Sequence, residues 1–384
     1  MFVGTQRYSA GQFESIVARN GGQQNAFTGS DTTSYYINIH KSQLPLAMEL
    51  EADRMRGIAP SDAAMEKEKQ VIIEERRERI ENNPYALFDE QLGAALYRNH
   101  PYRIPVIGWM HEMHGLSKQD VLAFHRRWYH PNNAVLVISG DITAKELRPL
   151  VEKYYGGLPR AKLPERRWTD EPPQNNARRL TLEHRNVKQP QWKRIYMAPS
   201  LAYGKKEQAL PLLVFSQLLG GNKSSLLYQS IVVEQKLASA IDVSYNGFAM
   251  GPGELAISAT PEKDVSLATL EAAIDKELVK WRAELPEASH ITRAKTRLKA
   301  DAMYARDGLT GMARIMGWMV MIGLPVDYFS RWPELIEAVT TEQMLTAAQN
   351  VLKPEQSVTG MLIPATSAPS EAKENETKQE GKGA

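Results

Sequence analysis

The sequence has no cysteine, no apolar run of membrane-spanning length and almost no net charge. Without cysteine, disulfides, thiolate metal sites and cysteine nucleophiles are excluded, so any bound metal needs His, Asp or Glu ligands. Lys plus Arg number 47 against 45 for Asp plus Glu, which gives no reason to expect a nucleic acid or a membrane surface as partner. No apolar stretch is long enough to predict a membrane span.

The length of 384 residues suits two domains of ordinary size. A polar, proline-bearing stretch near the middle of the chain is typical of a linker. We predict a first domain over residues 1–164, a linker over 165–187 and a second domain over 188–364. Residues 365–384 lack large apolar side chains and are predicted to be disordered.

Helices and strands alternate along the first domain. Residues 24–28 and 32–40 have the pattern of two strands joined by a turn, and residues 44–55 and 65–79 have helical spacing. The apolar residues 134–138 have the length of a further strand. This mixture predicts an α+β fold.

The second half of the chain repeats features of the first. Residues 339–345 align with residues 116–122, and Pro354 aligns with Pro131, in both cases 223 positions apart. A helix followed by a hairpin also recurs in residues 224–260. One spacing at two landmarks favours an internal duplication. The alternative is chance, because capped helices before strands are common in α+β proteins.

Two carboxylates on one predicted helix are the main candidates for chemistry. Glu68 and Glu75 are seven positions apart, so two helical turns place them on one face about 10 Å apart, with Ile72 between them. A carboxylate beside an apolar residue can ligate a divalent metal when histidines come from elsewhere. On spacing alone the alternative is a solvated face, which Glu–Lys and Glu–Arg pairs at i, i+4 usually mark.

Three other patterns do not carry a function. His111 and His114 are three positions apart, without the four-residue spacing and Glu of helical metalloprotease motifs, and predict a surface turn. The Gly-rich residues 220–225 have Asn222 where a phosphate loop needs glycine, so nucleotide binding is not expected. No Gly-x-Ser-x-Gly motif indicates a serine hydrolase.

A set of short motifs runs in order along both predicted domains. They are Met1 to Thr5 with Tyr8, residues 21–28, the helix from Glu68 to Glu75, His100-Pro101-Tyr102, residues 129–141, and Leu219-Gly220-Gly221 with Ser224 and Ser225. This ordered set resembles the pitrilysin or insulinase-like family of zinc metallopeptidases. The resemblance implies two homologous α/β-sandwich domains, the first lacking its N-terminal strands and its metal helix.

The resemblance implies a zinc site of which this chain carries only part. In the family an inverted His-x-x-Glu-His motif lies on a helix that leads into a segment like residues 1–5, and that helix is absent here. Its histidines would be two Zn²⁺ ligands, and its glutamate would be the general base that activates the metal-bound water. Glu75 is implied as the third protein ligand, and Glu68 as the carboxylate that supports it. We expect the chain as given to hold no catalytic zinc.

The resemblance also implies how a peptide substrate is held. The edge strand that pairs with an extended peptide backbone in this family corresponds to Asn25, Ala26, Phe27 and Thr28. The family's second domain often supplies an Arg and a Tyr at the metal, and the matching positions here are Val232 and Ser239. Some bacterial relatives divide these roles between paired subunits. We therefore expect a heterodimer in which a homologous partner supplies Arg and Tyr.

The predicted function is that of a zinc metalloendopeptidase subunit acting on peptides or unfolded segments. The chain is expected to be a truncated form, inactive alone, whose complete form carries the histidine motif. The alternative is a non-catalytic assembly subunit that keeps the peptidase fold, against which Glu68 and Glu75 argue. A bacterial periplasmic location is expected if a signal peptide lies upstream.

Overall fold

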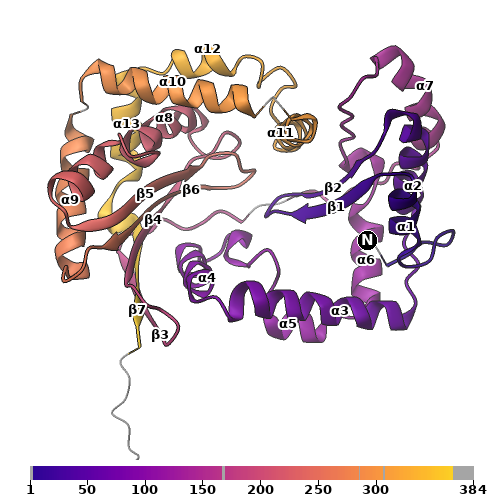
Figure 1. Cartoon of the computed structure of the whole chain (residues 1–384), viewed down its shortest axis with the longest axis horizontal. Helices are drawn as coiled ribbons and strands as arrows, with labels where there is room; N and C mark the ends of the chain where they lie inside the picture. Colours follow the sequence, from indigo (N-terminus) through magenta and orange to yellow (C-terminus); the bar gives the residue numbers. More distant parts are fainter. Residues whose placement is uncertain (1–2, 167–168, 285, 306–307, 366–384) are drawn as a thin grey trace, which may run out of the picture.

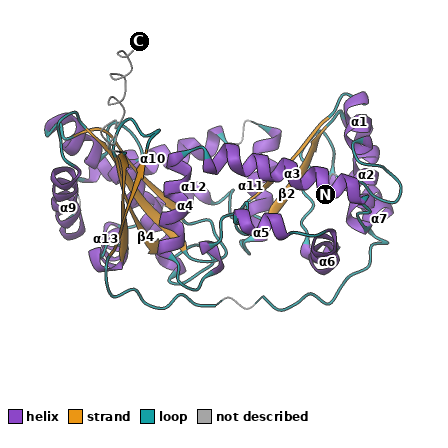
Figure 2. Cartoon of the chain, turned by 90° about the horizontal axis from the view of Figure 1, so that it is seen from below, coloured by secondary structure: helices purple, strands orange, loops and turns teal. Residues whose placement is uncertain are grey.

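The computed structural model of the chain consists of two units joined by a long irregular connection (Figure 1). It describes residues 3–166, 169–284, 286–305 and 308–365. Met1, Phe2 and nearly all of the tail predicted to be disordered therefore lie outside the described residues. The connection runs along one side of the molecule between the last helix of the first unit and the first strand of the second (Figure 2).

The first unit is mainly helical. Its elements are α1 (Gln12–Arg19), β1 (Gln23–Thr28), β2 (Thr33–Asn38), α2 (Leu44–Arg56), α3 (Asp62–Arg76), α4 (Pro84–Leu96), α5 (Met110–Gly115), α6 (Lys118–Trp128) and α7 (Ala144–Tyr155). A π-helical turn, Arg77–Glu81, extends α3. β1 and β2 form the predicted antiparallel hairpin, with Asn25 opposite Tyr36 and Phe27 opposite Ser34.

The second unit has a complete sheet covered by helices. Its elements are β3 (Arg178–His184), β4 (Gln191–Ala198), α8 (Ala209–Gly220), β5 (Ala238–Asn246), β6 (Gly253–Pro261), α9 (Leu267–Ala283), α10 (Ala288–Tyr304), α11 (Leu309–Met321), α12 (Trp332–Glu337), α13 (Thr341–Val351) and β7 (Ser357–Pro364). The strand order is β3-β7-β4-β6-β5, and β3 with β7 is the parallel pair. Leu212, Phe215, Ile274 and Met344 are fully buried between this sheet and α8, α9 and α13.

The two units repeat one order of elements. In the first unit, α1 is followed by β1, β2 and the helices α2 to α6. In the second unit, the π-helical turn Tyr228–Glu234 is followed in the same order by β5, β6 and the helices α9 to α13. α6 and α13 begin 223 residues apart, as do the short 3-10 turns Pro131–Asn133 and Pro354–Gln356 that follow them. The structure thus contains the predicted repeat. Within the described part of the first unit, β3, β4 and α8 have no counterparts.

The strand predicted at residues 134–138 is not formed. Ala134 has an extended backbone, with φ −137° and ψ 152°, but the segment pairs with no other strand of the described chain. Its counterpart β7 lies between β3 and β4, which pair with it on both sides. Because the first unit has no such neighbours among the described residues, the apolar segment has no sheet to join. Val135 is 39% exposed, whereas Val358, 223 positions later, is fully buried.

Helix α4 of the first unit packs on the sheet of the second. It covers the sheet face opposite α8, α9 and α13 (Figure 1). Phe88 and Leu92 are buried there against Val358 and Leu362. Gly360 of β7 permits this close approach, because a Cβ at that position would come within 2.6 Å of the Phe88 ring.

Helix α11 of the second unit lies in turn against the hairpin of the first. Thr310 Oγ1 donates to Asn38 Oδ1 at 3.2 Å, and the Trp318 ring lies against Gly29 in the β1–β2 turn. Trp318 Nε1 also donates to the carbonyl of Phe248 at 2.9 Å. Each unit therefore contributes one helix to the other, and this exchange sets how the two units sit together.

The carboxylate of Glu171 fastens the connection to the first unit. It accepts the backbone N–H groups of Arg98 at 2.5 Å, Asn99 at 2.8 Å and His100 at 2.9 Å. Burial raises the pKa of Glu171, but these three donors outweigh that effect and the net direction is down. The charged carboxylate is thus the form that holds the 98–100 turn.

We predict that Glu171→Gln lowers the free energy of unfolding at pH 7 by about 1 kcal/mol, since it removes a charge-assisted acceptor at a partly exposed site. A carboxylate with a depressed pKa stabilises the fold above its unfolded pKa of about 4.3, and that stabilisation is lost as pH falls through the lower folded value. The difference between wild type and variant in urea unfolding should therefore shrink below about pH 4. Glu183→Gln, on exposed β3, is the control and should change stability by less than about 0.5 kcal/mol. A penalty that does not depend on pH would contradict this role.

Candidate functional site

Helix α3 is anchored by the face that points away from the candidate site. The Ser61 hydroxyl caps its start by accepting the Ala64 N–H at 3.1 Å. Arg76, only 3% exposed, donates two parallel hydrogen bonds of 2.9 Å to Glu90 of α4 and one of 2.7 Å to the Gly108 carbonyl. A buried, bidentate arginine permits little rotation of the helix, so the direction of its neighbour Glu75 is set.

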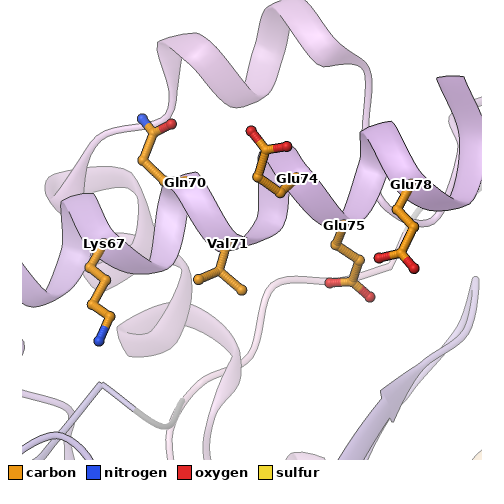
Figure 3. A pocket seen from close by; sticks show the side chains of 6 residues that line it. All are labelled: Lys67, Gln70, Val71, Glu74, Glu75 and Glu78. Carbon is orange, nitrogen blue, oxygen red and sulfur yellow. The ribbon is translucent and has the colours of Figure 1, made fainter. Parts of the chain in front are cut away.

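The opposite face of α3 borders an open hollow (Figure 3). Its lining residues are Lys67, Gln70, Val71, Glu74, Glu75 and Glu78. Val71 and Glu75 leave the helix on one side, whereas Glu74 points to the other (Figure 3). Val71 thus lies beside Glu75 at the hollow and is 52% exposed, whereas Ile72, predicted between the two carboxylates, does not line it.

Glu75 is accessible for binding. Its side chain is 38% exposed, and Oε1 lies 2.9 Å from Nη1 of Arg79, which is itself 71% exposed. Such an exposed i, i+4 pair contributes a few tenths of a kcal/mol at most, on the order of 0.3–0.5 kcal/mol, so a stronger ligand can displace it. Glu68 is half-buried on the same helix and forms no ion pair within the described residues.

The residues present do not fit a zinc ion by themselves. Within the described ranges, nowhere do three His, Asp or Glu side chains converge as metal ligands. His111 and His114 lie on α5, a short helix where the sequence predicted a turn, and join no such group. A catalytic zinc site takes three protein ligands, usually including histidine, so the described residues do not make up such a site. These residues alone therefore cannot activate a metal-bound water.

β1 presents an open strand edge next to this region. In the described chain β1 pairs with β2 alone. Its counterpart β5 is the outermost strand of the second sheet, and β6, the counterpart of β2, lies inside it. If the first unit follows the strand order of the second, β1 is the edge strand, and any additional strands pair on the far side of β2. Asn25, Ala26, Phe27 and Thr28 all belong to β1, so the predicted peptide-binding residues lie on an edge strand.

Both halves of the chain match models of one peptidase family. Residues 1–108 match the insulinase model, peptidase family M16, and residues 115–298 match the model of the peptidase M16 inactive domain. The chain belongs to peptidase family M16, the insulinase or pitrilysin family. The family resemblance of the sequence motifs is confirmed, and so is an α+β fold with two M16 domains.

Proteins similar to this M16 chain are described as zinc proteases. The zinc protease PqqE of Helicobacter pylori is 32% identical over 243 residues, which cover 62% of this chain and 53% of that protein. An uncharacterized zinc protease of Mycobacterium leprae is 31% identical over 250 residues, covering 63% and 55%. These matches span little more than half the length of either relative. A crystal structure of a protease from Helicobacter pylori superposes with a TM-score of 0.86 at 25% identity, covering 94% of this chain and 86% of that one.

The second M16 domain has Val232 and Ser239 at the two positions predicted from the sequence to match the family's Arg and Tyr. Val232 lies on the π-helical turn Tyr228–Glu234, and Ser239 lies on β5 with its hydroxyl 3.4 Å from the Thr260 carbonyl. Neither side chain supplies a cation or a phenol. No helix in the described ranges has the length and apolar character needed to cross a bilayer.

One role that sequence reasoning missed belongs to the His100-Pro101-Tyr102 motif. The Tyr102 hydroxyl donates to Asp31 Oδ1 at 2.6 Å and accepts the Gly251 N–H at 2.8 Å. Asp31 Oδ2 accepts the Met250 N–H at 3.0 Å. Asp31 follows β1 in the hairpin turn, so this cluster ties the β1–β2 hairpin of one domain to the other domain. The sequence contained the motif but gave no sign of what it contacts.

We predict that Tyr102→Phe loosens the hairpin turn, because it leaves the Gly251 N–H without its acceptor, at a cost of about 1–3 kcal/mol. Hydrogen exchange should become faster at residues 28–33 and at Gly251. Tyr245→Phe is the matched control, since it removes a similar bond, from Tyr245 to the Pro199 carbonyl at 2.5 Å, inside the second domain. Exchange at residues 28–33 that is equally fast in both variants would contradict a specific junction.

Proposed function

We propose that this M16 chain is the metal-bearing kind of subunit in a zinc endopeptidase. Glu75 is the carboxylate ligand of Zn²⁺, Glu68 supports it, and two histidines come from a His-x-x-Glu-His helix in a form extended ahead of residue 1. When zinc is bound, it acts as the Lewis acid that such peptidases use. The substrates are extended peptides or unfolded protein segments.

The observation that carries this proposal is the match between α3 and α10. α10 occupies the place of α3 in the second domain and packs on α8. Ile291 and Ala294 of α10, with Leu298 one turn further on, join the core that α10 shares with α8. Glu68, Val71 and Glu75 have the same spacing of three and four residues on α3, and each lies 223 positions before its counterpart. The carboxylates thus face the place where a counterpart of α8 would lie.

Exposed apolar side chains support the proposal that a further layer of structure covers this side of the first unit in the extended form. Phe124 on α6 is 58% exposed, whereas Ala347, 223 positions later on α13, is fully buried. Val135 and Leu136 are similarly exposed, and so is Val71. Single exposed apolar residues are common, but these four sit where the repeat in the second domain is covered. A segment carrying counterparts of β3, β4 and α8 would cover them.

The proposed substrate class follows from the open edge of β1. An extended peptide adds to such an edge through backbone hydrogen bonds, which depend little on side-chain identity. Peptides and unfolded segments can present a free backbone in this way, whereas folded proteins cannot. The β1 strand, residues Asn25 to Thr28, is therefore the proposed binding strand.

We predict that the extended form, carrying the histidine motif, binds about one zinc ion per chain and that Glu75→Gln abolishes this binding, because a neutral amide is a poor zinc ligand. Glu68→Gln should keep zinc but weaken it by about 10-fold to 100-fold, as expected for a supporting carboxylate. Metal content after dialysis measures both. Glu66→Gln is the matched control on the same helix, since Glu66 is exposed, does not line the hollow and should not affect zinc.

Two results would contradict the proposal. One is an upstream reading frame that encodes no His-x-x-Glu-His motif within a few dozen codons of Met1. The other is an extended form that binds no zinc or keeps it in Glu75→Gln. Absence of zinc would favour the alternative, an assembly subunit that has the peptidase fold without its chemistry.

We further propose that a second M16 subunit completes the site. Val232 and Ser239 supply neither charge nor phenol, so the partner provides Arg and Tyr. Tagged extended chain should co-purify with a homologous chain that lacks the histidine motif and has Arg and Tyr at these two positions. Peptidase activity should require both purified chains. Full activity of the extended chain alone would rule the partner out.

A further inference from the structure

One cation of the second domain lies over the proposed peptide-binding strand. The guanidinium of Arg314, on α11, is 4.4 Å from the centre of the Phe27 ring in β1. This distance is typical of a cation–π contact. Arg314 is otherwise exposed, and no Asp or Glu of the described ranges forms an ion pair with it.

The contacts on either side hold Arg314 in this position. Thr310 lies one turn before it and bonds Asn38, and Trp318 lies one turn after it and packs on Gly29. Residues four apart share one face of a helix. The face of α11 that carries Arg314 is therefore the face that lies on the hairpin.

The two strands of the hairpin carry no charged residue. β1 reads Gln-Gln-Asn-Ala-Phe-Thr and β2 reads Thr-Ser-Tyr-Tyr-Ile-Asn, without a charged residue in either strand. On the other face of the hairpin, Arg54 lies under Tyr35, but it is 2% exposed and paired with Glu51. Arg314 is thus an exposed charge that contacts the hairpin on the Phe27 side.

We propose that Arg314 gives this site a preference for peptides with an acidic side chain opposite Phe27. The inference rests on the proposed pairing of peptides with β1. In an antiparallel pair, directly opposed side chains lie on one face with Cβ atoms about 4.5–5.5 Å apart. A glutamate opposite Phe27 would therefore reach the guanidinium that covers the Phe27 ring. A guanidinium over an aromatic ring makes no hydrogen bond to that ring's edge, so its N–H donors can bind a carboxylate.

The test uses the full chain and three fluorescein-labelled peptides of one neutral, β-prone sequence with a central Glu, Gln or Lys. Fluorescence anisotropy should show the Glu peptide binding about threefold to fivefold tighter than the Gln peptide, the range of a partly exposed ion pair. The Lys peptide should bind more weakly than the Gln peptide. High salt should reduce the advantage of Glu, because exposed charges are screened.

Arg314→Gln should remove the difference between the Glu and Gln peptides while the Gln peptide binds within about twofold of its wild-type affinity, since backbone pairing is unchanged. Arg185→Gln, in the turn between β3 and β4, removes an equal charge from a distant exposed site and should keep the preference. A preference for Glu that persists in Arg314→Gln would overturn the inference.

The remaining outcomes separate this inference from the proposed function. Equal wild-type affinity for all three peptides would overturn the acidic preference and leave strand pairing standing. Failure of every peptide to bind would overturn strand pairing at β1 and the preference with it.

Discussion

The burial of α4 in the sheet of the other domain is the contact on which this structure depends. Phe88 and Leu92 are almost completely excluded from solvent against β7, and Gly360 provides the space. α4 is joined to α3 through the buried pair of Glu90 and Arg76. The direction of Glu75 is therefore set by a chain of contacts that begins in the second domain. Loss of a large aromatic such as Phe88 from this core would cost about 3–5 kcal/mol.

Local patterns predicted much of the fold and little of its assembly. Alternating residues predicted the β1–β2 hairpin, and one spacing at Pro131 and Pro354 predicted the repeat, because both signals lie within short segments. The prediction of a strand at residues 134–138 was wrong, because a strand also needs neighbouring strands, which the apolar pattern of a segment does not reveal. For the same reason the sequence did not indicate that the apolar face of α4 covers the other domain's sheet.

The candidate site shows the same division. Glu68 and Glu75 were identified from helical spacing, but that spacing alone favoured a solvated face. The family resemblance changed the interpretation, and the matching stripe on α10 now supports it on geometric grounds. The role of Tyr102 could not be predicted, because Asp31 and Gly251 approach it only after both domains fold. The comparisons show membership of family M16, whereas the role of Glu75 as a zinc ligand is a proposal that the extended form can test.

We propose that Glu75 completes a zinc site whose histidines lie on a counterpart of α8. Crystals of the extended form, measured on both sides of the zinc absorption edge, test it most directly. We expect one anomalous peak bound by two histidines and by Glu75, with the carboxylate oxygen at about 2.0–2.2 Å from the metal. A peak held without Glu75, or no peak where the α3 carboxylates face the added helix, would contradict it.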